Sequence, residues 1–237
     1  MNCERTAARR FARRLLEPRP GATRRLPVGL AGGIRFEAGP ELPLEYWLGL
    51  YESELAPWLR RFCQPGTRCI DVGGHYAYYA LTFAKLTQAP VYCYEPDPDA
   101  LARSRRNLAL NPSLAELIEL RQVGVGSRSG PGLVTLDADL LPVAARAQDA
   151  AWLLKIDVDG PEVEVLKGAE DFLSRIRPHV IVETHWQGLE DACGSLLVQA
   201  GYSPRVVTQR KLFPGDRSWP RGTSTHNRWL VAQGSTH

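Results

Sequence analysis

The sequence predicts a Rossmann-like α/β domain, in which a mostly parallel sheet carries helices on both faces. Short apolar runs alternate with amphipathic stretches along most of the 237 residues, which is typical of strand–helix–strand units. Two glycines, Gly73 and Gly74, follow the first buried run, as in a sharp turn from a strand into a helix. Acidic residues stand at the ends of several runs, on the side where open α/β sheets bind their ligands.

The first strand is expected over residues 68–72 and the next helix over residues 75–86. Free N–H groups at the start of that helix would point at a ligand bound over the glycine turn. A second strand is expected over residues 91–94, with Glu95 at its end. Because an acid at this position holds ribose hydroxyls in nucleotide-binding α/β folds, the pattern predicts a ligand that contains adenosine.

The glycine pattern indicates which adenosine ligand to expect. The spacing G-x-G-x-x-G of dinucleotide-binding turns and the phosphate-binding pattern G-x-x-x-x-G-K-[ST] are both absent. Asp71, just before the glycines, would repel a phosphate but suits the cationic ammonium group of S-adenosylmethionine. The alternative is that Gly73 and Gly74 form a structural turn and nothing more.

Composition excludes several classes of protein. Hydrophobic residues make up 44% and charged residues 23% of the chain, as in an ordinary globular domain. The net charge of +3 arises from eight arginines in residues 1–25, so the rest carries no basic footprint for nucleic acid. Five cysteines without zinc spacing indicate a reducing, cytoplasmic location. No apolar run approaches the roughly 18 residues of a membrane span.

The domain organisation follows from these patterns. Residues 1–27 are expected to form a basic N-terminal arm, and residues 28–237 a single domain. Within that domain, residues 28–66 are expected to be a lid or helical extension, and residues 67–237 the catalytic core. Aromatic residues at helical spacing predict a helix over residues 45–62, which Pro57 kinks or restarts.

The rest of the chain continues the alternation. Asp97 and Pro98 are expected to begin a helix that ends near residue 110. The other expected elements are a strand at 117–123, a helix from residue 139, a strand ending at Asp157, a helix from Gly160 to Ile176, a strand at 179–183, a helix at 189–200, and strands at 204–207 and 228–232 around a polar loop.

Four polar side chains follow the fourth and fifth strands: Asp157, Asp159, Glu183 and His185. Their positions place them beside the ligand, at the carboxyl ends of the strands. Two of them have simpler interpretations: Asp159 as an acid favoured at a helix N-terminus, and His185 as a histidine that caps a strand end.

The sequence resembles the FkbM family of S-adenosylmethionine-dependent methyltransferases. The matching residues are Asp71-Val72-Gly73-Gly74 with Tyr78-Tyr79, Glu95-Pro96, Thr135-Leu136-Asp137, the segment from Lys155 to Ala169, and Val182-Glu183. The resemblance implies the class I methyltransferase fold, with a seven-stranded sheet that ends in an antiparallel hairpin. It also implies O-methylation of a hydroxyl on a sugar, glycan or natural product.

Cofactor roles carry over from the family to Asp71, Gly73 and Glu95, and the full set of expected cofactor-binding residues is Asp71, Gly73, Gly74, His75, Tyr79, Glu95, Pro96 and Asp157. Three positions depart from the family pattern. His75 stands where the family usually has Asn, Ala77 where it has Gly, and Asp159 where it has Glu.

Methyl transfer to an alcohol requires the oxygen behind the methyl group and a group that removes its proton. The candidates are Asp157, Asp159, Glu183 and His185; we expect Asp159 or His185 to be the base, with Asp157 nearer the methionine end of the cofactor. Mg²⁺ at these acids is possible, but the spacing does not imply it. The expected acceptor is a small molecule or carbohydrate, which would suit Trp186 and the basic residues of the loop between the last two expected strands.

Two rival enzyme classes lack their motifs. No N/D-P-P-Y/F motif of amino-methyltransferases follows the fourth strand, and no Tyr-x-x-x-Lys pair of short-chain dehydrogenases occurs. A non-catalytic partner or scaffold protein with the same fold stays open as the alternative. The sequence does not indicate the oligomeric state.

Overall fold

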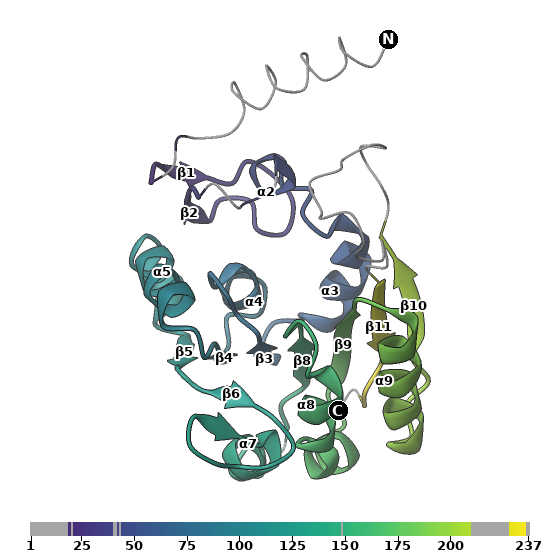
Figure 1. Ribbon diagram of the computed structural model, residues 1–237. Coiled ribbons are helices and arrows are strands. Elements are labelled where there is room, and N and C mark those ends of the chain that lie inside the picture. Colours follow the sequence, from purple (N-terminus) through teal and green to yellow (C-terminus); the bar gives the residue numbers. More distant parts are fainter. Residues whose placement is uncertain are drawn as a thin grey trace, which may run out of the picture.

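A seven-stranded sheet forms the centre of the computed structural model, which describes residues 19, 21–39, 42, 44–147, 149–209 and 228–235 (Figure 1). The strands lie in the order β10-β11-β9-β8-β3-β4-β5. Their bounds are β3 (Arg68–Val72), β4 (Val91–Tyr94), β5 (Ile118–Arg121), β8 (Trp152–Ile156), β9 (His179–Thr184), β10 (Arg205–Thr208) and β11 (Arg228–Ala232).

Strand direction confirms the predicted fold class. The strands from β5 to β9 pair in parallel, so their carboxyl ends meet at one edge of the sheet. Strand β11 runs antiparallel to both β9 and β10, which gives the expected C-terminal antiparallel hairpin. Strands β10 and β11 were predicted to within one residue at each end because their apolar runs are clearly bounded.

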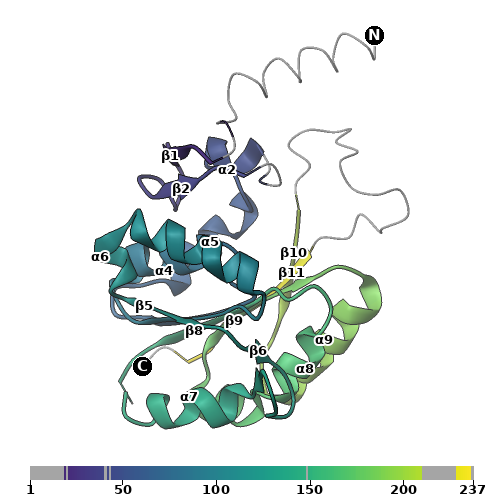
Figure 2. The same cartoon turned by 60° about the vertical axis from the view of Figure 1, so that its left-hand side comes forward.

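Helices cover both faces of the sheet (Figures 1 and 2). One face carries α3 (Ala56–Phe62), α4 (Tyr78–Thr87), α5 (Pro98–Ala109) and α6 (Pro112–Ala115); the other carries α7 (Leu136–Ala144), α8 (Glu162–Lys167), a π-helical turn η2 (Phe172–Ile176) and α9 (Gln187–Gln199). None of the described helices is long and apolar enough to cross a lipid bilayer.

The two faces bury separate hydrophobic clusters, and the side chains of each strand alternate between them. Cys69, Leu153 and Ile181 pack under α4, whereas Ile70 and Leu154 pack against the opposite layer. The same alternation places the polar residues near the strand ends. Asp71, Lys155 and Glu183 each stand two residues beyond a member of the α4-side cluster, so they share that face of the sheet.

An N-terminal segment, defined here as residues 21–55, lies over α4 and α5 (Figure 2). It contains an antiparallel hairpin of β1 (Thr23–Arg25) and β2 (Arg35–Glu37), then α2 (Leu44–Leu48) and η1 (Ser53–Leu55). The hairpin thus begins inside the range expected to be a basic arm; residues 1–18 and 20 of that arm lie outside the described residues.

Side chains of α5 and of Asn111, the residue before α6, fasten this segment to the core. Asn111 bonds both backbone groups of Arg35: its Oδ1 accepts from the N–H at 2.9 Å and its Nδ2 donates to the carbonyl at 2.7 Å. Asn107 Oδ1 accepts from the N–H of Glu37 at 2.9 Å, and Arg106 pairs with the Glu37 carboxylate at 2.6 Å. Buried Asn side chains therefore extend the hydrogen bonding of an edge strand.

Three expected helices differ in extent from those observed. The stretch 45–62 divides into α2, η1 and α3, with Pro57 in the first turn of α3. Helix α4 begins at Tyr78 rather than near residue 75. The helix expected up to Ile176 is interrupted at Gly168, where a Cβ atom would lie 1.9 Å from the carbonyl oxygen of Gly126.

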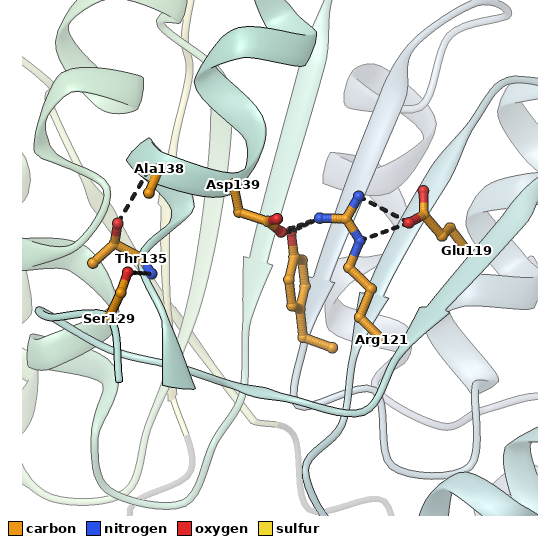
Figure 3. A network of polar contacts seen from close by, with 7 residues as sticks. Glu119, Arg121, Ser129, Thr135, Ala138 and Asp139 are labelled. Atoms are coloured by element: carbon orange, nitrogen blue, oxygen red, sulfur yellow. Dashed lines mark hydrogen bonds and ion pairs between the residues drawn. The ribbon is translucent and has the colours of Figure 1, made fainter. Parts of the chain in front are cut away.

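A polar network ties β4 and β5 to α7 (Figure 3). The Arg121 guanidinium lies between the carboxylates of Glu119, at 2.9 Å, and Asp139, and Asp139 also accepts from the Tyr94 hydroxyl at 2.5 Å. Thr135 begins the helix by accepting from the N–H of Ala138 at 3.1 Å. These contacts hold α7 against β5 and against β4, which Glu95 directly follows.

Candidate functional site

The turn after β3 is built from two glycines that neighbouring strands require. A Cβ atom at Gly73, whose φ is +85°, would lie 1.7 Å from the carbonyl oxygen of Asp157. A Cβ atom at Gly74 would lie 2.1 Å from the Cys93 sulfur. Both glycines therefore allow the turn to pack on β4 and on the end of β8, and the turn lies directly beside Asp157.

The turn that follows the glycines contains two residues in left-handed backbone conformations. His75 has φ +45° and Ala77, the residue before α4, has φ +62°. Asn and Gly adopt this region more readily than other residues. The Asn and Gly that the FkbM pattern carries at these two positions are thus explained by backbone geometry, and the same geometry explains why α4 starts at Tyr78.

Replacing Ala77 with glycine is expected to stabilise the fold by about 0.5–1 kcal/mol, because the relief of left-handed strain exceeds the entropic cost of glycine. Ala84→Gly is the matched control, since Ala84 is equally buried but lies inside α4. The control should lose about 1 kcal/mol or more. Urea unfolding measures both, and equal losses would refute the assignment of strain to Ala77.

Glu95 closes the turn at the end of β4. Its side chain is 7% exposed and accepts hydrogen bonds from the N–H groups of His75 and Asp97, each at 2.8 Å. A carboxylate has about four acceptor positions, so two backbone donors leave capacity for hydroxyl groups of a ligand. Pro96, the next residue, is exposed on the same edge.

Asp71 lies buried beneath the turn. Asp71 is fully buried, and within the described part of the chain neither of its carboxyl oxygens has a hydrogen-bond partner. Burial raises the pKa of Asp71 to about 6, although the nearby Lys155 ammonium opposes the shift. A buried acceptor without a donor is rare in proteins and is found where strain or a functional role maintains it.

Lys155 is the cation of a buried polar cluster on this face. It is 1% exposed, and its Nζ lies 2.8 Å from Asp157 Oδ2 and 4.3 Å from the centre of the Tyr79 ring. Burial disfavours the ammonium, but the carboxylates of Asp157, Glu52 and Asp71 reverse this effect and raise the pKa of Lys155. Lys155 therefore stays charged in the interior.

Glu52 joins the cluster from the N-terminal segment. Its Oε2 accepts from the Tyr79 hydroxyl at 2.5 Å, and burial raises the pKa of its carboxyl. Tyr79 was expected to bind cofactor; its hydroxyl instead meets Glu52, and its cofactor role stays a prediction. A cavity of about 160 Å³ adjoins these two residues on the side of the N-terminal segment.

Asp157 and Glu183 form a pair of carboxyl groups at the ends of β8 and β9. The last parallel partners are Ile156 and Val182, so the two acids follow side by side. Their carboxyl groups are in hydrogen-bond contact. Burial, then the neighbouring Asp157 charge, raises the pKa of Glu183, whereas Lys155 outweighs burial and lowers the pKa of Asp157.

His185 and Asp159 complete this side of the site. The Nε2 atom of His185 lies 3.3 Å from Asp159 Oδ1 and 3.8 Å from Glu162 Oε1. The Asp159 side chain is 93% exposed, and its φ of +55° holds it in a left-handed loop conformation. Donor atoms of Asp157, Glu183 and His185 lie within 4.8 Å of one another.

The predicted site residues therefore divide into two adjoining groups at the carboxyl edge of the sheet. Asp71, Gly73, Gly74, His75, Glu95 and Pro96 surround the ends of β3 and β4; Asp157, Asp159, Glu183 and His185 surround the ends of β8 and β9. The contact of Gly73 with the Asp157 carbonyl joins the groups. The basic loop with Arg210, Lys211, Arg217, Trp219, Arg221 and His226 lies outside the described residues.

Sequence reasoning missed Glu52 and Lys155 as members of the site. Lys155 carried a usable signal, because a lysine inside an apolar strand requires a buried partner. Glu52 carried none, since it lies in a connecting segment whose position depends on tertiary packing.

Comparisons with known proteins find one matching family model and several solved structures with the same fold. The family model of the methyltransferase FkbM domain matches residues 131–204. No curated protein sequence matches the chain. Among solved structures, methyltransferase FkbM from Methylobacillus flagellatus KT has a TM-score of 0.53 at 16% identity, over 70% of this chain and 43% of that chain, so the chain spans less than half of that protein.

Two further structures share the fold over most of their length. Precorrin 8w decarboxylase of Methanobacterium thermoautotrophicum has a TM-score of 0.53 at 18% identity, covering 84% of this chain and 97% of that one. A methyltransferase from Pyrococcus furiosus has a TM-score of 0.50 at 16% identity, covering 85% and 89%. The expected class I methyltransferase fold and the resemblance to FkbM proteins are confirmed.

Proposed function

We propose that the chain transfers a methyl group from S-adenosylmethionine to a hydroxyl group of a sugar, glycan or natural product, on the premise that residues 131–204 match the model of the methyltransferase FkbM domain. The carrying observation is that carboxyl and imidazole groups at the ends of β8 and β9 adjoin the glycine turn between β3 and α4. One group of residues thus suits an adenosyl ligand, and its neighbour suits the removal of a proton.

The cofactor side fits S-adenosylmethionine by the chemistry of its donors. Glu95 retains free acceptor positions for ribose hydroxyls. Asp71, with no hydrogen-bond donor among the described residues, adds negative charge beneath the turn, which favours a cationic ligand over a phosphate. When bound, S-adenosylmethionine supplies an electrophilic methyl group. Gly73, Gly74, His75 and Pro96 would line its adenosyl end and Asp157 its methionine end.

The acceptor side holds the groups that take the proton. We assign the base to the pair of Asp159 and His185, whose Oδ1 and Nε2 atoms lie 3.3 Å apart and of which Asp159 is exposed to solvent. Asp157 and Glu183 set the charge beneath this pair. Trp186, which follows His185 and is 45% exposed, offers an apolar face on which a sugar ring can pack.

The other proposals concern the cellular setting. Cys63, Cys69, Cys93 and Cys193 are buried free thiols, which suits the cytoplasmic location expected from the sequence. A small-molecule or carbohydrate acceptor is proposed, with no nucleic-acid partner.

The first experiment measures ligand binding by thermal unfolding, with S-adenosylmethionine, S-adenosylhomocysteine and, as a control, NAD. An adenosyl ligand at about 100 times its dissociation constant should add about 2.7 kcal/mol of stability. No shift with either adenosyl ligand at millimolar concentration would favour the non-catalytic partner protein.

The second experiment follows a labelled methyl group from S-adenosylmethionine into a panel of sugars and glycans. Asp159→Asn and His185→Asn should each slow transfer by about 10²–10⁴-fold, the usual contribution of a general base. Binding of S-adenosylhomocysteine should persist in both variants. Unchanged transfer rates would remove the base assignment.

A further inference from the structure

Three side chains at the ends of β8 and β9 converge in the way that cation ligands do. One donor atom each from Asp157, Glu183 and His185 lies within 4.8 Å of the other two. Asp157 directly follows β8, Glu183 lies in β9, and His185 directly follows β9. Two neighbouring strands of a buried sheet therefore fix the spacing of the donors.

The surrounding charges are unbalanced. The cluster contains four carboxyl groups, which belong to Glu52, Asp71, Asp157 and Glu183. Lys155 supplies the ammonium group, which lies 2.8 Å from Asp157 Oδ2. Asp71 has no hydrogen-bond partner within the described residues although it is fully buried. Buried charges require compensation, so this cluster has room for further positive charge.

The contact between Asp157 and Glu183 gives that charge a location. Two carboxyl groups in hydrogen-bond contact need a proton or a cation between their oxygens. The imidazole of His185 lies beside them as a third donor group. Carboxylates near the ring nitrogen, here Asp159 at 3.3 Å, make a histidine a better metal ligand.

We propose that Asp157, Glu183 and His185 bind one divalent cation of the Mn²⁺ type. Two of the three ligands are carboxylates, which among transition metals favour Mn²⁺ in six-coordinate geometry, and the imidazole adds one nitrogen ligand. Three protein ligands leave positions open on the solvent side, because Asp157 and His185 are 24% and 23% exposed.

The proposed role of the cation rests on the proposed methyl transfer, whereas its binding does not. A divalent cation here would lower the pKa of an acceptor hydroxyl at the open positions. Within the Asp159–His185 pair assigned above, His185 would then contribute to transfer as a ligand of the cation, and Asp159 would be the member that takes the acceptor proton.

The test is a titration of the full chain, freed of metal with EDTA, with Mn²⁺ and without S-adenosylmethionine. Electron paramagnetic resonance of free Mn²⁺ gives the stoichiometry and affinity. We expect one Mn²⁺ per chain, with affinity reduced at least about 10-fold in Glu183→Gln and His185→Ala. Glu170→Gln is the matched control, because Glu170 is exposed and is not one of the three proposed ligands. This variant should bind Mn²⁺ as the unsubstituted chain does.

Absence of a saturable one-to-one site in the unsubstituted chain would overturn the proposal, and so would unchanged affinity in His185→Ala, whose surface position allows it to fold. S-adenosylhomocysteine binding, measured separately, tells the two proposals apart. Mn²⁺ binding without adenosyl binding would support the cation site and contradict the methyl transfer; the reverse result would contradict the cation site alone.

Discussion

Replacing Glu95 with alanine is expected to weaken binding of S-adenosylmethionine and S-adenosylhomocysteine by at least about 100-fold. A hydrogen bond to a charged group contributes about 1.5–3 kcal/mol, and the two ribose hydroxyls would lose one each. The N–H groups of His75 and Asp97 would also lose their acceptor, so the turn itself would loosen. Isothermal titration with S-adenosylhomocysteine measures the change.

Two further variants separate binding from folding. Glu95→Gln keeps the shape and one acceptor oxygen, so it should retain the fold and still bind more weakly than the unsubstituted chain. Glu116→Ala removes an exposed acid near the neighbouring strand β5 and should change nothing. An affinity within threefold of normal in Glu95→Ala would mean that the adenosyl group lies elsewhere.

Removing the Lys155 ammonium is expected to destabilise the protein by about 3–5 kcal/mol, the usual result of breaking a buried ion pair from one side. Lys155→Met keeps the length of the side chain but leaves Asp157, at 2.8 Å, without its cation. The carboxyl groups of Glu52 and Asp71 would lose the same compensation. Urea unfolding at pH 7 gives the free energy.

The control for this variant is Lys167→Met. Lys167 pairs with Glu164 at the same N–O distance of 2.8 Å, but both side chains are about half exposed. Exposed pairs contribute about 0–1 kcal/mol, so the control should lose little. Adding Asp157→Asn to Lys155→Met should restore part of the stability. Equal losses in the two lysine variants would mean that burial does not decide the value of this ion pair.

The sheet could be predicted because each core strand is a short apolar run with clear borders. Residues 68–72, 91–94, 152–156 and 228–232 coincide with strands for this reason. Helix starts were harder, because the left-handed φ of His75 and Ala77 delays α4 and nothing in those side chains indicates it. The break at Gly168 depends on a contact with Gly126, which is visible only after folding.

The candidate site, too, could be predicted from the sequence only in part. Asp157 and Glu183 follow strands, so the topology of parallel sheets places them correctly. Glu52 reaches Tyr79 from a connecting segment, and that position depends on how Asn107 and Asn111 hold the hairpin. Arg106, whose side chain is 56% exposed, pairs with Glu37 of that hairpin. Long-range packing of polar side chains is the information that sequence periodicity lacks.

The anchoring of the N-terminal hairpin also has a consequence for synthesis. Arg35 leaves the ribosome 76 residues before its partner Asn111. At about 5–20 residues per second, the hairpin waits roughly 4–15 s for the helix that holds it. Glu52 can reach the ionic cluster only after that wait, and Glu183 arrives later still. The nascent chain therefore carries an unanchored hairpin until Asn111 emerges and a solvated acid until Lys155 emerges, and the charged centre closes only when the last core strands have emerged.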